Sequence, residues 1–146
     1  MNKDQQVEAL LQQPCHIIDY LPRRVPESAG GYCFSVERYF LERKRLRHMA
    51  ESYTRIILKT LCYFDYAVYT EKWLNRSDCG TLAKAIAKVV VRKKGTIHIL
   101  LPTENALLQI IGGDLYITAY NCGDNIAQTL QLLAASEGLF WREGQN

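Results

Sequence analysis

Basic residues are the most concentrated chemical groups in this sequence. A cationic run lies between residues 38 and 59, and a second cluster lies near residue 92. If a fold brings the two together, the candidates for binding an anion are Arg43, Lys44, Arg47, Arg92, Lys93 and Lys94. Contacts from Lys and Arg to phosphates give an affinity that is independent of base sequence and falls with salt. The pattern therefore predicts an anion- or nucleic-acid-binding surface on the helix 38–59, where Tyr39, Phe40 and Tyr53 are candidates for stacking on bases.

The distribution of charge leaves a second interpretation of the same residues. Residues 38–94 contain fourteen Lys/Arg and five Asp/Glu, a net charge of +9, whereas residues 1–37 carry −2 and residues 95–146 carry −4. The basic run winds around much of its helix, and Glu42 lies at helical spacing from Arg38 and Arg45. Such charges are also typical of a solvated helix face, or of a surface that meets the acidic ends of the chain.

Two cysteines stand at the start of predicted helices, in the pairs Cys79-Gly80 and Cys122-Gly123. The positive end of a helix dipole stabilises a thiolate, which makes Cys79 and Cys122 the candidates for a reactive thiol. A nucleophile also needs a base, and no histidine is near either cysteine in the sequence. Asp78 further disfavours a thiolate at Cys79. We therefore expect a structural role for both thiols.

Metal-binding and hydrolase motifs are absent from the sequence. Cys15 and His16 are neighbours in a predicted strand, so their side chains point to opposite faces of the sheet. The chain has no Gly-x-Ser-x-Gly, no phosphate-binding Gly-x-x-x-x-Gly-Lys and no His-Glu-x-x-His. The sequence predicts no metal site and no cofactor. An enzyme stays open as a third alternative, because catalytic residues need not be neighbours in sequence.

Aromatic residues are slightly abundant, with nine Tyr and two Trp. Tyr and Trp favour interfaces because they combine a large apolar area with a polar group. The candidates for a contact surface are Tyr69, Trp73, Phe140 and Trp141. Together with the missing catalytic motifs, they make a non-enzymatic protein-interaction module the leading hypothesis. Its partner is another protein or a second copy in a homodimer, bound through a sheet edge or the aromatic C-terminal surface.

Periodic apolar residues indicate the helices that position these groups. Leu46, Met49, Tyr53 and Ile57 belong to one apolar stripe, which predicts a long amphipathic helix over 38–62. Other helices are predicted at 3–13, 81–91 and 124–136, the second capped by Ser77 or Asp78. Strands are predicted at 15–20, 32–37, 66–69, 96–101, 106–111, 115–120 and 139–141, with a hairpin turn at 112–114.

These elements predict an α+β fold with a largely antiparallel sheet and helices packed on one face, in two layers. A three-strand meander over residues 96–120 is expected at its centre. At 146 residues the chain fits a single domain, 1–146, without an internal linker. The first residues lack a signal-peptide pattern, and the longest uncharged stretch, 125–136, is too short for a membrane helix. Five scattered cysteines without a Cys-x-x-Cys pair favour reduced thiols and a cytoplasmic protein.

Overall fold

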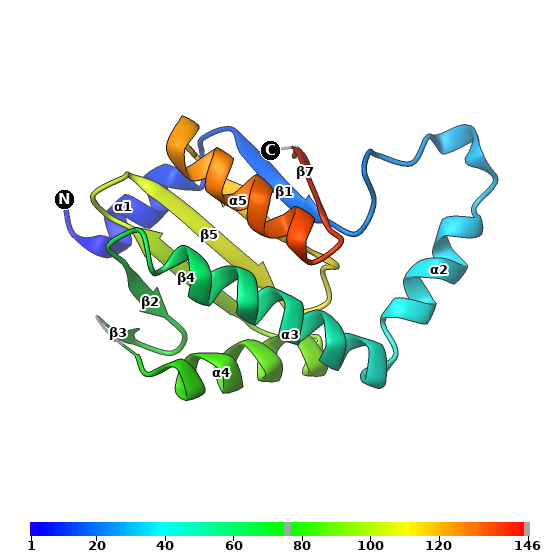
Figure 1. Cartoon of the computed structure of the whole chain (residues 1–146), viewed down its shortest axis with the longest axis horizontal. Coiled ribbons are helices and arrows are strands. Elements are labelled where there is room, and N and C mark those ends of the chain that lie inside the picture. Colours follow the sequence, from blue (N-terminus) through cyan, green and yellow to red (C-terminus); the bar gives the residue numbers. More distant parts are fainter. Residues whose placement is uncertain (75–76, 145–146) are drawn as a thin grey trace.

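The computed structural model describes residues 1–74 and 77–144, and these contain one antiparallel sheet of seven strands (Figure 1). The strand order is β3-β2-β4-β5-β6-β1-β7. The strands are β1 (Cys15–Asp19), β2 (Ala67–Tyr69), β3 (Trp73–Leu74), β4 (Thr96–Leu101), β5 (Ala106–Ile111), β6 (Tyr116–Tyr120) and β7 (Phe140–Glu143). The predicted meander of β4, β5 and β6 forms the centre of the sheet, so this expectation is confirmed.

Three helices cover one face of the sheet, as the two-layer α+β prediction required (Figure 1). They are α3 (Arg43–Thr60), α4 (Cys79–Arg92) and α5 (Asp124–Ser136). Their apolar stripes meet the sheet in one large core, in which Tyr53, Ile86 and Leu130 are fully buried. Within the described ranges, no helix combines the length and the apolar character that crossing a membrane requires.

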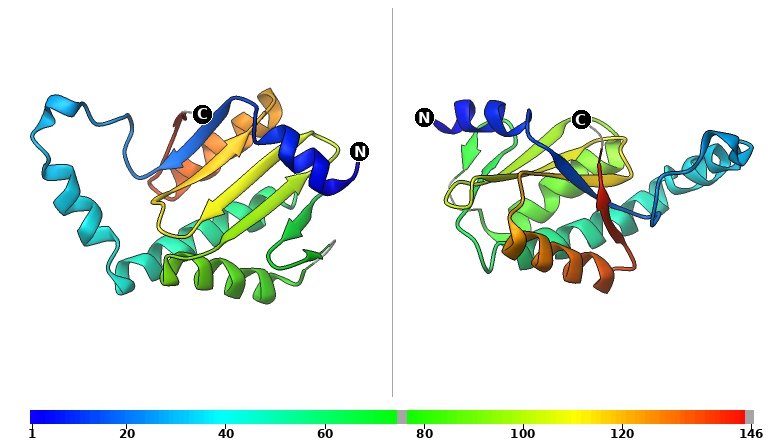
Figure 2. Two further views of the ribbon diagram at one scale, coloured as in Figure 1. Left: turned by 180° about the vertical axis from the view of Figure 1, so that it is seen from behind. Right: turned by 90° about the horizontal axis from the view of Figure 1, so that it is seen from above.

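A fourth helix, α1 (Lys3–Leu10), lies on the opposite face of the sheet (Figure 2). Its Val7 and Leu10 pack on Leu100 of β4 and Leu107 of β5. Successive strand residues point to opposite faces, so this contact explains why β4 and β5 are apolar on both sides. The rest of this face is more polar and carries His98, Gln109 and Thr118 in one row across paired strands.

The segment 32–37 was predicted as a strand, and this prediction is wrong: residues Tyr32–Phe40 form helix α2. The alternation of Tyr32, Phe34 and Val36 resembles a strand, but no described strand pairs with this segment. A helix satisfies its backbone hydrogen bonds internally, whereas an isolated strand leaves them unpaired. The predicted helix 38–62 also starts too early, because the chain is extended at Glu42 and α3 begins at Arg43. Arg38 therefore belongs to α2.

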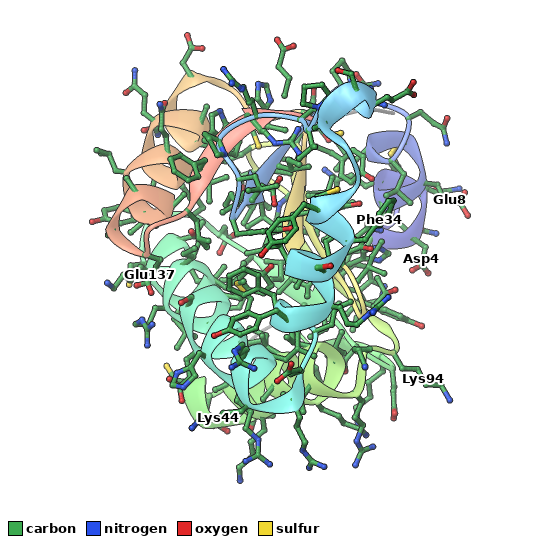
Figure 3. All side chains as sticks on the ribbon, turned by 90° about the vertical axis from the view of Figure 1, so that its right-hand side faces the viewer. Asp4, Glu8, Phe34, Lys44, Lys94 and Glu137 are labelled. Atoms are coloured by element: carbon green, nitrogen blue, oxygen red, sulfur yellow. The ribbon has the colours of Figure 1, made fainter. Side chains whose placement is uncertain are left out.

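Helix α2 and its flanking loops, residues 20–42, form an arm that projects from the body (Figures 1 and 2). No residue of α2 is buried, and Tyr32 and Phe34 are 77% and 66% exposed (Figure 3). The two ends of the arm meet at its base, where the ring of Phe40 lies 5.0 Å from that of Tyr20 and both side chains pack against the core.

Candidate functional site

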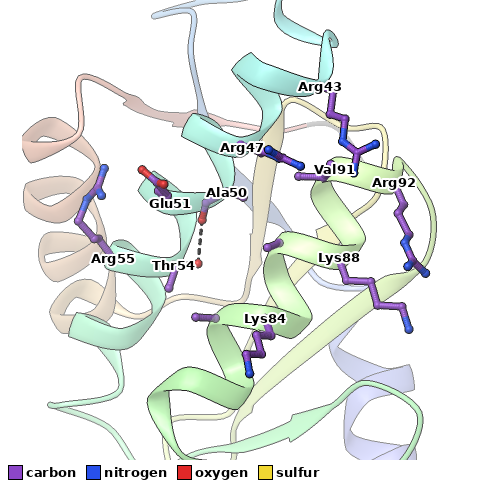
Figure 4. A pocket seen from close by; sticks show the side chains of 12 residues that line it. Arg43, Arg47, Ala50, Glu51, Thr54, Arg55, Lys84, Lys88, Val91 and Arg92 are labelled. Atoms are coloured by element: carbon purple, nitrogen blue, oxygen red, sulfur yellow. Dashed lines mark hydrogen bonds between the residues drawn. The ribbon is translucent and has the colours of Figure 1, made fainter.

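Helices α3 and α4 lie side by side and run antiparallel, so the start of α3 faces the end of α4 (Figure 4). The ends of α4 are well defined. Asp78 caps its first turn by accepting a 2.8 Å hydrogen bond from the Thr81 backbone N–H, as predicted. Lys93 ends it in the left-handed conformation, with φ 56°. This pairing brings together the two basic clusters that are far apart in the sequence.

A groove with a volume of about 730 Å³ runs between the two helices. Cations line both of its sides, with Arg43 and Arg47 on α3 and three more on α4, namely Lys84, Lys88 and Arg92. Small or apolar side chains form the floor, namely those of Ala50, Thr54, Ala83, Ala87 and Val91. The site therefore combines an apolar bottom with positively charged walls, hereafter the α3–α4 groove.

The five cations of the groove are not paired with Glu51, the acid that also lines it. Across residues 1–74 and 77–144, none of them forms an ion pair. Two further charged residues on its edge, Glu51 and Arg55, point toward the α5 side in Figure 4. Arg55 binds Glu137 there, with 2.7 Å between Nη2 and Oε1. The positive potential of the groove is thus left for an external anion to neutralise.

The N-terminus of α3 contributes partial positive charge at this end of the groove, and the acidic N-cap residue Glu42 offsets part of it. The first turn of the helix contains no acidic residue, and Glu42 at the N-cap makes no side-chain cap hydrogen bond. The first N–H groups of a helix are partly positive, and cations such as Arg43 are unfavourable beside them. Acidic residues in the first turn would stabilise the helix more than Arg43 does. Residues that break such a rule of helix stability are often found at functional sites.

The structure unites half of the predicted anion-binding residues. Arg43, Arg47 and Arg92 line the groove, whereas Lys44, Lys93 and Lys94 do not. Figure 3 shows Lys44 and Lys94 projecting outward from the molecule. Sequence reasoning missed Lys84 and Lys88. Their spacing from Arg92, at i, i+4 and i+8, was the signal for one helical stripe.

The aromatic residues proposed for base stacking are occupied within the protein. Tyr53 is fully buried, and Phe40 packs on Tyr20. The ring of Tyr39 lies 3.4 Å from the guanidinium of Arg45. No aromatic residue is among those that line the groove. The groove therefore offers cations to a ligand but no stacking platform.

The predicted interface residues lie at the two edges of the sheet. Tyr69 and Trp73 belong to β2 and β3, and Phe140 and Trp141 belong to β7. The Trp73 indole donates a 2.8 Å hydrogen bond to Asp4, and Trp141 stacks on His16 with 4.7 Å between ring centroids. Phe140 is 42% exposed and is the most accessible of the four. Both tryptophans thus have internal partners, and the four residues do not form one surface.

The two candidate thiols lie in different environments. Cys79 is exposed at the first position of α4, and Cys122 is partly buried before α5. Burial raises the pKa of the Cys122 thiol to about 12. Cys122 therefore stays protonated near neutral pH, which opposes a role as a nucleophile.

We expect alkylation to separate these thiols. In the native chain at about pH 8, iodoacetamide should modify Cys79 readily, and Cys122 should react on the order of a thousandfold more slowly than an ordinary thiol. Mass spectrometry of the peptides after timed quenching measures both rates. In urea the two rates should converge. Equal rates in the native chain would contradict the burial of Cys122.

Among the described residues, no three His, Cys, Asp or Glu side chains are close enough to hold a metal ion. His98 lies on the open face of the sheet, where a ring nitrogen is 2.9 Å from the Gln109 amide. Burial lowers the pKa of His98, so its imidazole is neutral at neutral pH. Its environment is that of a hydrogen-bonded structural histidine.

No protein-family model, curated protein or solved structure matches this chain. Its function therefore has to be inferred from the chemistry of its own surface. The α3–α4 groove gathers five cations around a floor of small or apolar side chains.

Proposed function

We propose that this chain is a non-enzymatic protein-interaction module that binds an acidic amphipathic helix of another protein in the α3–α4 groove. The observation that carries the proposal is the set of five cations that form no ion pair among the described residues, around a floor of small apolar side chains. A helix in a groove buries its apolar stripe and places polar residues at the rims. Acidic residues at those rims would complement the charge of the groove and speed association.

The spacing of the cations specifies the partner more closely. Lys84, Lys88 and Arg92 follow one another at four-residue steps, a stripe about 12 Å long at 1.5 Å per residue. A helix lying along α4 meets this stripe with Asp or Glu at the same i, i+4 and i+8 spacing. The alanines of the floor permit close approach of its backbone, and its apolar side chains fill the groove.

A protein helix fits the groove better than a nucleic acid does. Single-stranded nucleic acids gain affinity by stacking bases on aromatic residues, and none lines this groove. Phosphates and sugars gain nothing from an alanine and valine floor, whereas apolar side chains do. We place this interaction in the cytoplasm. Cys33, Cys62, Cys79 and Cys122 are free thiols, as is usual for proteins in a reducing compartment.

Selection from a displayed peptide library tests the proposal. The library contains helical peptides of about 18 residues, or five turns, and the full chain is the bait. We expect enrichment of peptides that combine an apolar stripe with Asp or Glu at four-residue spacing. Their affinity should fall about tenfold or more in Arg47→Glu/Lys88→Glu. Fluorescence anisotropy with the enriched peptides measures the affinity, and labelled RNA is titrated in parallel.

Lys44→Glu/Lys94→Glu is the matched control, because it makes the same change in net charge outside the groove, on α3 and just after the end of α4. Binding to this control should stay close to that of the original chain. A third variant, Ala87→Trp, fills the floor and should block a peptide while sparing a phosphate backbone. The proposal is overturned if the enriched peptides lack acidic residues, or if the two charge variants lose the same affinity. It is also overturned if the chain binds RNA with an affinity that Ala87→Trp does not change.

A further inference from the structure

A second site lies where the arm meets the end of the sheet, on the side of β1 and β7. Two adjoining cavities, of about 410 and 290 Å³, share four lining residues: Arg24, Asp114, Tyr116 and Arg142. Cys33 and Glu37 of α2 form one wall of the larger cavity. Thr118 and Gln109 of the open sheet face line the smaller one. Together these cavities form the arm cleft, whose combined size suits a small molecule.

The two charged residues at the floor of the arm cleft pair with each other. Asp19 is 4% exposed and accepts hydrogen bonds from Nε and Nη2 of Arg142, at 3.1 and 2.7 Å. Its other carboxylate oxygen accepts the backbone N–H of Tyr20 at 2.8 Å. This buried pair is structural, because the carboxylate of Asp19 has its partners within the chain.

The other charged residues of the cleft form no ion pair among the described residues. Arg24, from the loop before α2, and Glu37, from α2 itself, are exposed and form no ion pair among the described residues. Asp114, from the turn between β5 and β6, is partly buried and likewise lacks a cationic partner. Burial raises the pKa of Asp114, although a hydrogen bond from Tyr116 opposes this shift. A guanidinium and two carboxylates thus line one cleft without forming an ion pair among the described residues.

Two tyrosine hydroxyls near this cleft also lack partners. The hydroxyl oxygens of Tyr20, which lines the larger cavity, and Tyr53 are buried without a hydrogen bond among the described residues. Tyr53 is fully buried, and its pKa is raised first by burial and then by the nearby Asp19 and Asp114. Unpaired buried hydroxyls are uncommon in proteins, and they indicate polar chemistry at this end of the sheet.

We propose that the arm cleft binds a free α-amino acid. Its carboxylate would pair with Arg24, and its ammonium group would pair with Asp114 and Glu37. A simple anion would be repelled by the two carboxylates, and a simple amine would leave Arg24 without a partner. A molecule that carries an ammonium group and a carboxylate on one carbon would pair with all three groups at once. This site is separate from the α3–α4 groove and does not depend on the function proposed for it.

Calorimetric titration of the full chain with each of the standard L-amino acids tests this proposal, with acetate, phosphate and methylamine as probes of a single charge. At least one amino acid should bind with a Kd of about 1 mM or lower, and the single-charge probes should not. Arg24→Gln and Asp114→Asn should each weaken that binding about tenfold or more. Bound amino acid should also slow hydrogen exchange of the backbone amides of residues 32–40, because α2 forms a wall of the cleft.

Arg23→Gln is the matched control. It removes the same charge from the neighbouring residue, which lines neither of the two cavities. Its affinity for the amino acid should equal that of the original chain. The proposal is overturned if no amino acid binds with a Kd of about 1 mM or lower. Acetate, phosphate or methylamine binding as tightly as the best amino acid would also overturn it, as would equal affinity in Arg24→Gln and Arg23→Gln.

Discussion

Gly112→Ala is expected to destabilise the fold by about 3 kcal/mol or more, a large share of a typical domain's stability. Gly112 lies where the turn after β5 presses on the connection between α4 and β4. A Cβ atom at this position would lie 2.1 Å from the backbone nitrogen of Lys94 and 2.7 Å from the carbonyl carbon of Lys93. Both atoms belong to the backbone, so a change of side-chain rotamer cannot relieve the clash. Urea unfolding followed by circular dichroism measures the change in free energy.

Gly123→Ala is the control for this substitution. A Cβ at Gly123 meets no atom within 4 Å, and the backbone there, at φ −72°, suits any residue. Its cost should stay below about 1 kcal/mol, the value of a modest N-cap change. A Gly112→Ala chain as stable as Gly123→Ala would show that the turn and the α4–β4 connection are not in close contact. Such a result would also question the position of Arg92 at the end of the groove.

The second large effect is expected from Arg142→Met, at about 3–5 kcal/mol. Arg142 is the cationic partner of the buried carboxylate of Asp19, and removing it leaves a charge in the protein interior without compensation. In the double variant Asp19→Asn/Arg142→Met, the buried charge is gone, and we expect much of the stability to return. A double-mutant cycle in urea measures the coupling between the two residues.

Glu42→Gln is the matched test on an exposed pair. Glu42 and Arg45 also form a salt bridge, but the side chain of Glu42 is 60% exposed. An exposed pair contributes less than about 1 kcal/mol because water and salt screen it. Similar losses for Glu42→Gln and Arg142→Met, or no recovery in the double variant, would contradict a buried pair at the sheet end.

Local patterns were sufficient to predict most of the fold. The apolar stripe through Leu46, Met49 and Tyr53 indicated α3, and the glycines at 112–113 indicated the hairpin. The residues 32–37 misled the prediction, because alternation describes a strand only where a neighbour provides hydrogen bonds. Whether a segment has a neighbouring strand depends on the whole sheet and cannot be read from the segment itself. The two-residue strand β3 was missed for the related reason that so short a segment has no period of its own.

Sites were less predictable than elements because they depend on contacts between distant residues. Arg43 and Arg92 were recognised as basic, but only the packing of α3 on α4 shows that they share a groove. The ion pair of Asp19 with Arg142 joins residues separated by 123 positions. Spacing along the chain carries no information on such a pair. Likewise, the sequence shows Arg24 and Asp114 only as residues of two separate loops, and the structure shows that both line the arm cleft.

The position of β1 in the sheet has a consequence for synthesis of the chain on the ribosome. β1 ends at Asp19, yet both of its neighbours, β6 and β7, begin at Tyr116 or later. About 100 residues must therefore be translated before β1 can pair, which takes about 5–20 s at usual elongation rates. During this interval an apolar segment containing Ile17 and Ile18 emerges without a partner strand. The apolar residues of β1 consequently stay without their strand partners until β6 and β7 have been made, and the sheet is completed only then.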